Sequence, residues 1–485
     1  EKSHPYFQDE MWIKQDFLVN RLVTIFARNV LFTDPMKKIL LFMAGIFLLQ
    51  SVLYSAPPDG DKILPSPIYQ KKLANGLNVV TVPYASPGIA SFYIVVRVGS
   101  RNEIEPGHTG FAHFFEHMMF RGTEKYPKEK YSEVLKSTGA SANANTSLDR
   151  TVYHMTGSSA KLETMFELEA DRFQHLKYSL QGFKTEAGAV KGEYTKNSAN
   201  PYTKLNEMVQ NAAFDKHTYK HTTMGFFEDI VDMPNQYEYS LEFFQRFYRP
   251  EYCTILVVGD VTREQVEGLS QKYFGSWKAG SFTSTILAEP EQSVTRYTHL
   301  KKSGFPPYLS LNYKGPGYND TDLDFNALDI LCSMLFSENS SLYEELVIND
   351  QKVRSVEGGA YNTRDPFLVS VEASLVNVND LQYVKDRITT TLEKAKSDSP
   401  DLKAMEAARM NIKNSFRMRI DNPTTIAENL SFFTWLSGDP ESLNRYYANY
   451  DKVTPADLQR VAKKYFTPER LTVGTISPND TENLK

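Results

Sequence analysis

The sequence predicts a chain built from two copies of one domain of strands and helices. An aromatic-x-Pro-Glu-x-x-Thr step leads into an apolar strand twice, at residues 247–260 and again at residues 465–476. Each copy of this step follows a helical pattern that ends in aromatic residues. Self-similarity of this kind is typical of a duplicated domain. In register with the first copy, the apolar helix expected at residues 322–336 corresponds to the one at residues 110–120.

The elements of the first copy follow from hydrophobic patterns of period 2 for strands and 3.6 for helices. Asn75 and Gly76 form a turn signal before the first strand. The second copy is expected to repeat, at residues 308–313, the strand that precedes the first apolar helix. In chain order, the first copy should contain strands at residues 77–82 and 90–98, helices at 110–120 and 131–137, an edge strand that runs through Tyr153, helices at 160–176 and 183–194, and a strand at 254–260.

The helix expected at residues 110–120 is apolar except for His113, Glu116 and His117. At helical pitch, positions i, i+3 and i+4 share one face, so these three side chains point the same way. Two imidazoles one turn apart can bind one Zn²⁺ through nitrogen at about 2.0–2.1 Å, with the carboxylate between them close to a metal-bound water. Three ionisable groups are costly to bury unpaired, which favours a metal site over three structural side chains. The order His-x-x-Glu-His is the inverse of the commoner zinc-protease helix.

A third ligand is expected from a second helix, because a catalytic zinc ion normally has three protein ligands. The helix at residues 183–194 carries Glu186 and Glu193. These two positions are separated by about two helical turns, so both side chains project from one face. Each is therefore a candidate for the third ligand.

These two helices resemble the M16 family of zinc metallopeptidases, the inverzincins that include pitrilysin, insulysin and the mitochondrial processing peptidase. Residues 99–110 are similar to the family's lead-in to its metal helix, and residues 142–153 are similar to its active-site edge strand. The resemblance covers about residues 68–480. It implies that Glu193 is the third zinc ligand, and that Glu186 supports the site by contact with a ligand without binding the metal itself.

The resemblance also implies a fold and an activity. The fold is α+β, with two homologous sheet-plus-helix domains of the LuxS/metallohydrolase-like type that enclose a cavity. Backbone groups around Asn143 and Ala144 would hold the substrate as an added strand. The activity is zinc-dependent peptide hydrolysis, in which Glu116 takes a proton from the attacking water and returns it to the leaving amine. The second copy has no histidine in its equivalent helix, so we expect it to be catalytically silent.

One part of the family pattern is missing from the second copy. The Arg and Tyr that hold substrate carbonyl groups in the family fall here on Ser341 and Arg354, with Tyr343, Tyr361 and Arg364 as nearby substitutes. Arg354 is therefore a possible oxyanion donor. The alternative that the resemblance implies is a second M16-like subunit that supplies the missing pair. A non-catalytic scaffold subunit is less favoured, because all three ligands and the base are present.

Composition is that of a sizeable globular protein. The chain has 485 residues, 41% of them hydrophobic, and a formal net charge of −5, which argues against a nucleic-acid-binding surface. Its two cysteines, Cys253 and Cys332, lie in apolar segments without C-x-x-C spacing. We expect them to be small core residues, neither a disulfide nor a zinc site.

The N-terminal part contains a charged, then apolar, then small-residue pattern at residues 36–56, which is typical of a secretory signal peptide. Residues 1–35 would then lie upstream of the mature protein. An uncleaved membrane anchor is the alternative, although the apolar run is shorter than the ~20 residues of a spanning helix. We expect export, to the bacterial periplasm. The expected mature domains are a catalytic zinc-binding domain at residues 65–279, a linker at 280–296 and a non-catalytic domain at 297–480.

Overall fold

The computed structural model describes residues 62–479, so the expected signal peptide and upstream segment lie outside the described residues. The first half contains a six-stranded sheet in the order β1-β2-β6-β3-β5-β4. β2 and β6 pair in parallel and every other neighbouring pair is antiparallel. The central strands are buried on both faces, which matches their runs of β-branched and aromatic residues. The strands are β1 (Tyr69–Lys72), β2 (Asn78–Pro83), β3 (Ile89–Val96), β4 (Ser141–Thr146), β5 (Thr151–Ser158) and β6 (Cys253–Gly259).

The second half repeats this topology in a five-stranded sheet with the order β7-β11-β8-β10-β9. Here too one pair, β7 with β11, is parallel and the other pairs are antiparallel. The strands correspond in order, so that β2, β6, β3, β5 and β4 match β7, β11, β8, β10 and β9. The predicted α+β duplication is confirmed. The strands are β7 (Arg296–Lys301), β8 (Tyr308–Lys314), β9 (Val353–Ala360), β10 (Leu368–Leu375) and β11 (Leu471–Ser477).

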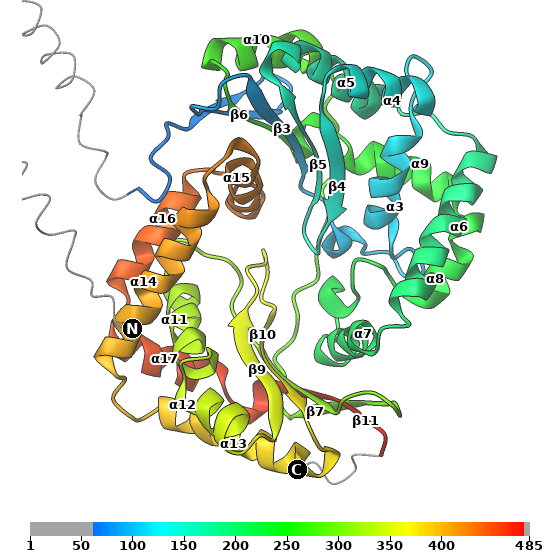
Figure 1. Ribbon diagram of the computed structural model, residues 1–485. Helices are drawn as coiled ribbons and strands as arrows, with labels where there is room; N and C mark the ends of the chain where they lie inside the picture. The colour runs from blue at the N-terminus through cyan, green and yellow to red at the C-terminus, as the bar shows by residue number, and fades with distance from the viewer. Residues whose placement is uncertain (1–61, 480–485) are drawn as a thin grey trace, which may run out of the picture. The chain divides into compact units, whose positions relative to one another are not determined.

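Helices accompany each sheet in a corresponding chain order (Figure 1). In the first half they are α3 (Phe111–Met118), α4 (Lys128–Ser137), α5 (Leu162–His175), α6 (Leu180–Asn197), α7 (Pro201–Ala213), α8 (Phe227–Asp232), α9 (Tyr237–Phe247) and α10 (Arg263–Phe274). In the second half they are α11 (Asp324–Phe336), α12 (Ser341–Tyr343), α13 (Leu381–Ala395), α14 (Leu402–Arg419), α15 (Pro423–Ser437), α16 (Ser442–Asn449) and α17 (Pro455–Tyr465). Among the described residues, no helix has both the length and the apolar character that crossing a membrane requires.

Two helices are exchanged between the halves. α7 belongs to the first half but packs on β7 and β11 of the second sheet, whereas α15 of the second half packs on β3 and β6 of the first (Figure 1). Both helices begin with an Asn-Pro pair in which the asparagine side chain accepts backbone N–H groups as the N-cap. At Gly474 of β11, a Cβ atom would lie 2.6 Å from Val209 of α7, so the close approach of this helix requires glycine. The exchange ties the two halves together.

The elements for which the sequence predicted residue ranges are found near those ranges, but one of them differs in kind. The single edge strand expected through Tyr153 is a hairpin of two strands, and only β4 forms the edge of the sheet. The turn at residues 147–150 reverses the chain after Thr146, where a Ser147 N–H donates to the Arg150 carbonyl at 2.8 Å. Cys253 and Cys332 are both buried and free, which confirms that they are core residues.

Candidate metal centre

The metal centre is built on α3, whose apolar face is buried completely. Phe111, Phe114, Phe115 and Met118 are each 0% exposed, and this burial fixes which face of the helix remains for its polar residues. The helix begins after Gly110, whose φ of 90° lies in the left-handed region. The remaining face is directed toward α6, which packs against α3.

A carboxylate from the lead-in segment holds the N-terminus of α3. Glu103 accepts the N–H groups of Gly110 and Ala112, both at 2.7 Å, and so satisfies donors that no side-chain cap on the helix itself reaches. Burial raises the pKa of Glu103 to about 8, while the backbone N–H groups oppose this rise. Sequence reasoning recognised the lead-in only as a family feature, because a cap that arrives from another loop leaves no local spacing signal.

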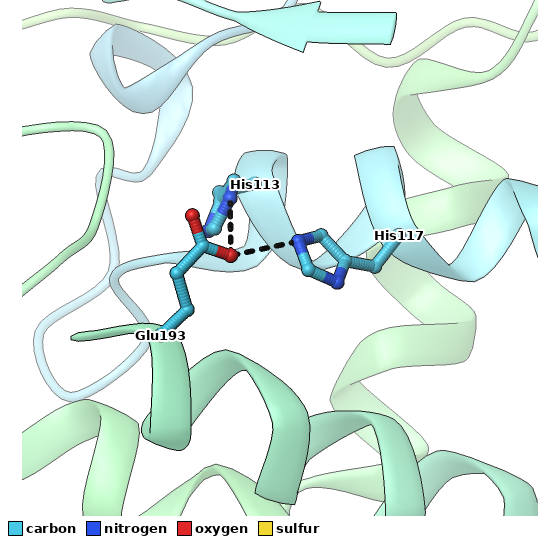
Figure 2. A group of neighbouring side chains, drawn as sticks. All are labelled: His113, His117 and Glu193. Carbon is cyan, nitrogen blue, oxygen red and sulfur yellow. Dashed lines mark ion pairs between the residues drawn. The ribbon is translucent and has the colours of Figure 1, made fainter. Parts of the chain in front are cut away.

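Three predicted ligands meet at one point (Figure 2). Glu193 Oε2 lies 3.2 Å from His117 Nε2 and 3.7 Å from His113 Nε2, and the three ligand atoms lie within 4.8 Å of one another. Ligands placed tetrahedrally at about 2.0–2.1 Å from a zinc ion would be roughly 3.3 Å apart. Two imidazoles and one carboxylate with these separations fit zinc. Among residues 62–479, this is the one such group of potential metal ligands.

Glu186 stands directly behind His117. Its Oε1 atom is 3.0 Å from His117 Nδ1, and its Oε2 atom accepts a hydrogen bond from Arg121. Burial alone would raise the pKa of Glu186, but His117 and Arg121 outweigh it and hold this pKa below its ordinary value. A His117 Nδ1–H that donates to Glu186 leaves Nε2 free to bind a metal. Arg121 was not found from the sequence, because it lies outside the His-x-x-Glu-His pattern.

The two histidines differ in their surroundings. The hydrogen bond to Glu186 raises the pKa of His117, whereas burial lowers the pKa of His113 against the opposing charge of Glu116. His113 Nδ1 is buried and has no hydrogen-bond partner within the described part of the chain. The burial of His113 favours the neutral imidazole, which is the form that binds metal.

Glu116 is separate from the three ligands. Its Oε2 atom accepts a hydrogen bond of 2.6 Å from the hydroxyl of Thr146, the last residue of β4. Glu116 directly precedes His117 on α3, which places it beside the candidate ligands. The sequence identified Glu116 but not Thr146, because the two residues belong to different elements that only the fold brings together.

Asn143 and Ala144 lie in the middle of β4, which packs beside α3. Ala144 is 7% exposed and faces the core under α3, while Asn143 is exposed on the other face. Because β4 is the edge of its sheet, one side of its backbone is unpaired within the described residues. This edge can accept an extended peptide by β-augmentation.

A cavity of about 590 Å³ begins where β4 ends. Its wall includes the turn at residues 147–150, α7, strands β8 and β10, and two aromatic residues of α15, Phe432 and Trp435. Five residues of this wall have a buried polar atom without a hydrogen-bond partner in the described structure: Ser147 Oγ, Arg150 Nε, Gln210 Oε1, Asn362 Oδ1 and Trp435 Nε1. Both donors and acceptors are therefore left for a bound molecule or for water.

Arg354, the possible oxyanion donor, lies on β9, which is the edge strand of the second sheet. It is exposed near the beginning of β9, and Tyr361, which lines the cavity, lies just beyond the other end of that strand. Ser355, the next residue of β9, is only two strands away from Tyr308, which also lines the cavity. Arg364 is nearer to the first half, since its backbone N–H donates to Asp149 at 3.0 Å. Its cationic neighbour Arg101 pairs with Asp365 at 2.5 Å.

Comparisons with known proteins agree with this geometry. A family model described as Insulinase (Peptidase family M16) matches residues 79–225, and one described as Peptidase M16 inactive domain matches residues 236–412. Zinc protease PqqE of Helicobacter pylori is 29% identical over 84% of this chain and 92% of its own length. A probable mitochondrial-processing peptidase subunit beta of Arabidopsis thaliana is 24% identical over 84% of this chain and 77% of its own length. The crystal structure of a protease from Helicobacter pylori superposes with a TM-score of 0.79 at 27% identity, over 85% of this chain and 100% of that one.

Proposed function

The chain belongs to the M16 family of zinc peptidases, and from this premise we propose that it is an endopeptidase that hydrolyses peptides or short unfolded polypeptides held between its two halves. The observation that carries the proposal is the meeting of His113, His117 and Glu193 at separations that suit one zinc ion. The described triad lies on two helices of the first half, α3 and α6.

Each residue of the centre has a part in the proposed reaction. When bound to the triad, zinc polarises the scissile carbonyl and lowers the pKa of water towards 7, so that attack proceeds at neutral pH. Glu116 takes the proton of the attacking water and delivers it to the leaving amine. Glu186 orients His117 and keeps its Nε2 lone pair directed at the ligand position.

Substrate binding is proposed to use the free edge of β4 and the cavity beyond it. Asn143 and Ala144 would pair with the substrate backbone, which carries one donor and one acceptor for each residue. The unpartnered donors and acceptors of the cavity wall suit a peptide main chain for the same reason. Two aromatic residues, Phe432 and Trp435, add apolar contact area.

The proposal includes a second M16-like subunit that closes over the substrate. Support comes from the sequence, in which Ser341 and Arg354 stand where the M16 resemblance expects the Arg and Tyr that hold substrate carbonyl groups. Loss of one such donor typically lowers turnover by about 10²–10³. The chain alone should then bind zinc and hydrolyse peptides slowly, and the partner should raise turnover without a change in zinc content.

Export to the bacterial periplasm also remains a proposal. It rests on the charged, apolar and small-residue pattern of residues 36–56. Protein from the native source should begin near Pro57, as measured by N-terminal sequencing or intact mass. A mature chain that keeps Glu1 would contradict export by this route.

The proposed chemistry is tested with three glutamate-to-glutamine variants, assayed for zinc by metal analysis and for hydrolysis with a quenched peptide library. Glu193→Gln should lose zinc and activity together, because it removes a charged ligand. Glu116→Gln should keep zinc and lose turnover, because the base does not bind the metal. Glu186→Gln should weaken zinc binding by about 10–100-fold.

Equal zinc occupancy in the Glu193→Gln and Glu116→Gln variants would contradict the assigned roles. A zinc-loaded wild-type chain that hydrolyses no peptide, alone or with a partner, would favour a non-catalytic assembly subunit instead.

A further inference from the structure

The hydroxyl of Thr146 holds the carboxylate of Glu116, the group proposed as the base. Thr146 Oγ1 lies 2.6 Å from Glu116 Oε2, across the interface between the edge strand and the metal helix. Glu116 is half-buried and has several rotatable bonds, so without this contact its carboxylate could adopt other rotamers. Thr146 is β-branched and therefore has a restricted χ1 angle, which suits it to hold another group.

The direction of this hydrogen bond follows from the neighbouring threonine. Thr151 lies opposite Thr146 in the β4–β5 hairpin, and its hydroxyl donates to the carbonyl oxygen of Val98 at 3.0 Å. The two threonine oxygens are 3.4 Å apart. Because the single hydroxyl hydrogen of Thr151 is engaged by Val98, the hydrogen of Thr146 is free to be donated to Glu116. The result is a chain of contacts from Val98, just after β3, to the Glu116 carboxylate.

The end of the hairpin that carries Thr146 is rigidly held. In the turn that follows it, the carboxylate of Asp149 is 0% exposed and accepts the Tyr219 hydroxyl at 2.6 Å. The other carboxylate oxygen accepts the backbone N–H of Arg364, which belongs to the second half, at 3.0 Å. The Leu148 carbonyl accepts the Arg101 N–H at 2.7 Å. The second half therefore helps to fix the strand end from which Thr146 reaches Glu116.

We propose that Thr146 is a positioning residue for peptide hydrolysis, which fixes one oxygen of the Glu116 carboxylate so that the other is presented to the attacking water. This inference rests on the proposed function, in which Glu116 is the base. A base must lie within hydrogen-bond reach of the proton that it accepts, so a carboxylate in the wrong rotamer lowers kcat. The Thr146 side chain is bonded to Glu116 and Thr151, and its replacement leaves the backbone of β4 in place, so KM and zinc content should not change.

The test compares Thr146→Ser, which keeps the hydroxyl, with Thr146→Val and Thr146→Ala, which remove it. Thr146→Val should lower kcat by about 10–100-fold at unchanged KM and zinc content. Thr146→Ser should restore turnover to near the wild-type value. Thr156→Val is the matched control, because it removes a hydroxyl of the same hairpin that bonds instead to Ser91 and Thr424. Its kcat should match the wild type.

A double-mutant cycle with Glu116→Gln separates this inference from the proposed function. If Thr146 acts through Glu116, adding Thr146→Val to Glu116→Gln should cause little further loss. An equal loss in both backgrounds would overturn the inference, as would a folded, zinc-loaded Thr146→Val enzyme with wild-type kcat. Should the valine variant misfold, equal kcat values for the serine and alanine variants would overturn it in the same way. Wild-type turnover in Glu116→Gln itself would instead refute the proposed base, and the inference with it.

Discussion

The metal helix α3 and its counterpart α11 occupy equivalent places in the two halves but carry different polar residues. Counted from the first residue of each helix, Asn326 stands where α3 has His113, Asp329 where it has Glu116, and Ile330 where it has His117. The pattern of polar positions is thus partly retained in α11 although both metal-binding imidazoles are replaced. The scaffold therefore accommodates a carboxylate at this helix position in either half.

The fate of that carboxylate depends on its neighbours. Glu116 is half-buried and accepts a hydrogen bond from the Thr146 hydroxyl at 2.6 Å. Asp329 accepts the hydroxyls of Tyr446 at 2.8 Å and Tyr450 at 2.5 Å. Burial raises the pKa of Asp329, and the two tyrosines oppose the rise. In the described structure, the carboxylate at this position therefore accepts one threonine hydroxyl in the first half and two tyrosine hydroxyls in the second.

The largest expected effect separates these two carboxylates by function. Glu116→Gln should lower kcat by about 10²–10⁴ while the free energy of unfolding changes little. Asp329→Asn should leave kcat near the wild-type value but lower the free energy of unfolding by about 1–3 kcal/mol, because a buried hydrogen-bond network is disturbed. Peptide hydrolysis and urea unfolding of both variants measure this. A large fall in kcat for Asp329→Asn would mean that the halves share the chemistry.

A second variant places the two histidines of α3 at the equivalent positions of α11. Asn326→His combined with Ile330→His should not create a second zinc site, because α14 has Ser415 where α6 has Glu193, counted from the start of each helix. Asn326 and Ile330 are both 0% exposed, so we expect the two histidines to lower the free energy of unfolding by about 2–4 kcal/mol. Metal analysis should still find one zinc per chain. Two zinc ions per chain would show that the imidazoles alone distinguish the helices.

We expect the carboxylates at the N-termini of α3 and α11 to make the free energy of unfolding depend on pH in opposite directions. Asp324, the first residue of α11, accepts hydrogen bonds from Lys464, Tyr465 and Arg460. Burial alone would raise the pKa of Asp324, but these three partners outweigh burial and lower it to about 2. Its folded pKa lies below the unfolded value of 3.8, so its contribution of about 2 kcal/mol is present above pH 4 and lost as the pH falls towards 2. Glu103 at α3 has a folded pKa raised to about 8, so its contribution is present below pH 4.5 and lost as the pH rises through 8.

Urea unfolding from pH 2 to 9 tests this contrast. Asp324→Asn should flatten the acid side of the stability profile, and Glu103→Gln should flatten the side above pH 4.5, at about 1.4 kcal/mol for each unit of pKa shift. The slopes decide the matter even if a variant is less stable throughout. An unchanged slope in either variant would mean that the carboxylate in question does not titrate as expected.

The smallest expected effect concerns the two exchanged helices. Asn200 caps α7 through the N–H of Tyr202, and Asn422 caps α15 through those of Thr424 and Thr425. Asn200→Ala and Asn422→Ala should each lower the free energy of unfolding by about 1 kcal/mol, and their effects should add because the caps are independent. Thermal or urea unfolding of the single and double variants measures this. A strongly non-additive double variant would show that the exchange is coupled across the two halves.

Local spacing in the sequence was enough to predict the duplicated fold and to single out the candidate metal ligands and the proposed base. His113, Glu116 and His117 share one helix face, and Glu186 and Glu193 share another, so helical periodicity selects these positions. The family resemblance then assigned the ligand role to Glu193. The Pro-Glu step at residues 247–260 and 465–476 revealed the duplication, because both copies lead into equivalent central strands, β6 and β11. These features depend on neighbours within one or two turns, or on repetition, and both can be read along the chain.

The tertiary structure decided which distant groups complete the site. Thr146 meets Glu116, Arg121 meets Glu186, and Glu103 caps α3 from a preceding loop, while α7 and α15 exchange between the halves. Each of these contacts joins residues on different elements, so no periodicity relates them. Their partners are set by how helices and strands pack, and packing depends on the shape and volume of the whole core rather than on the spacing of any one segment.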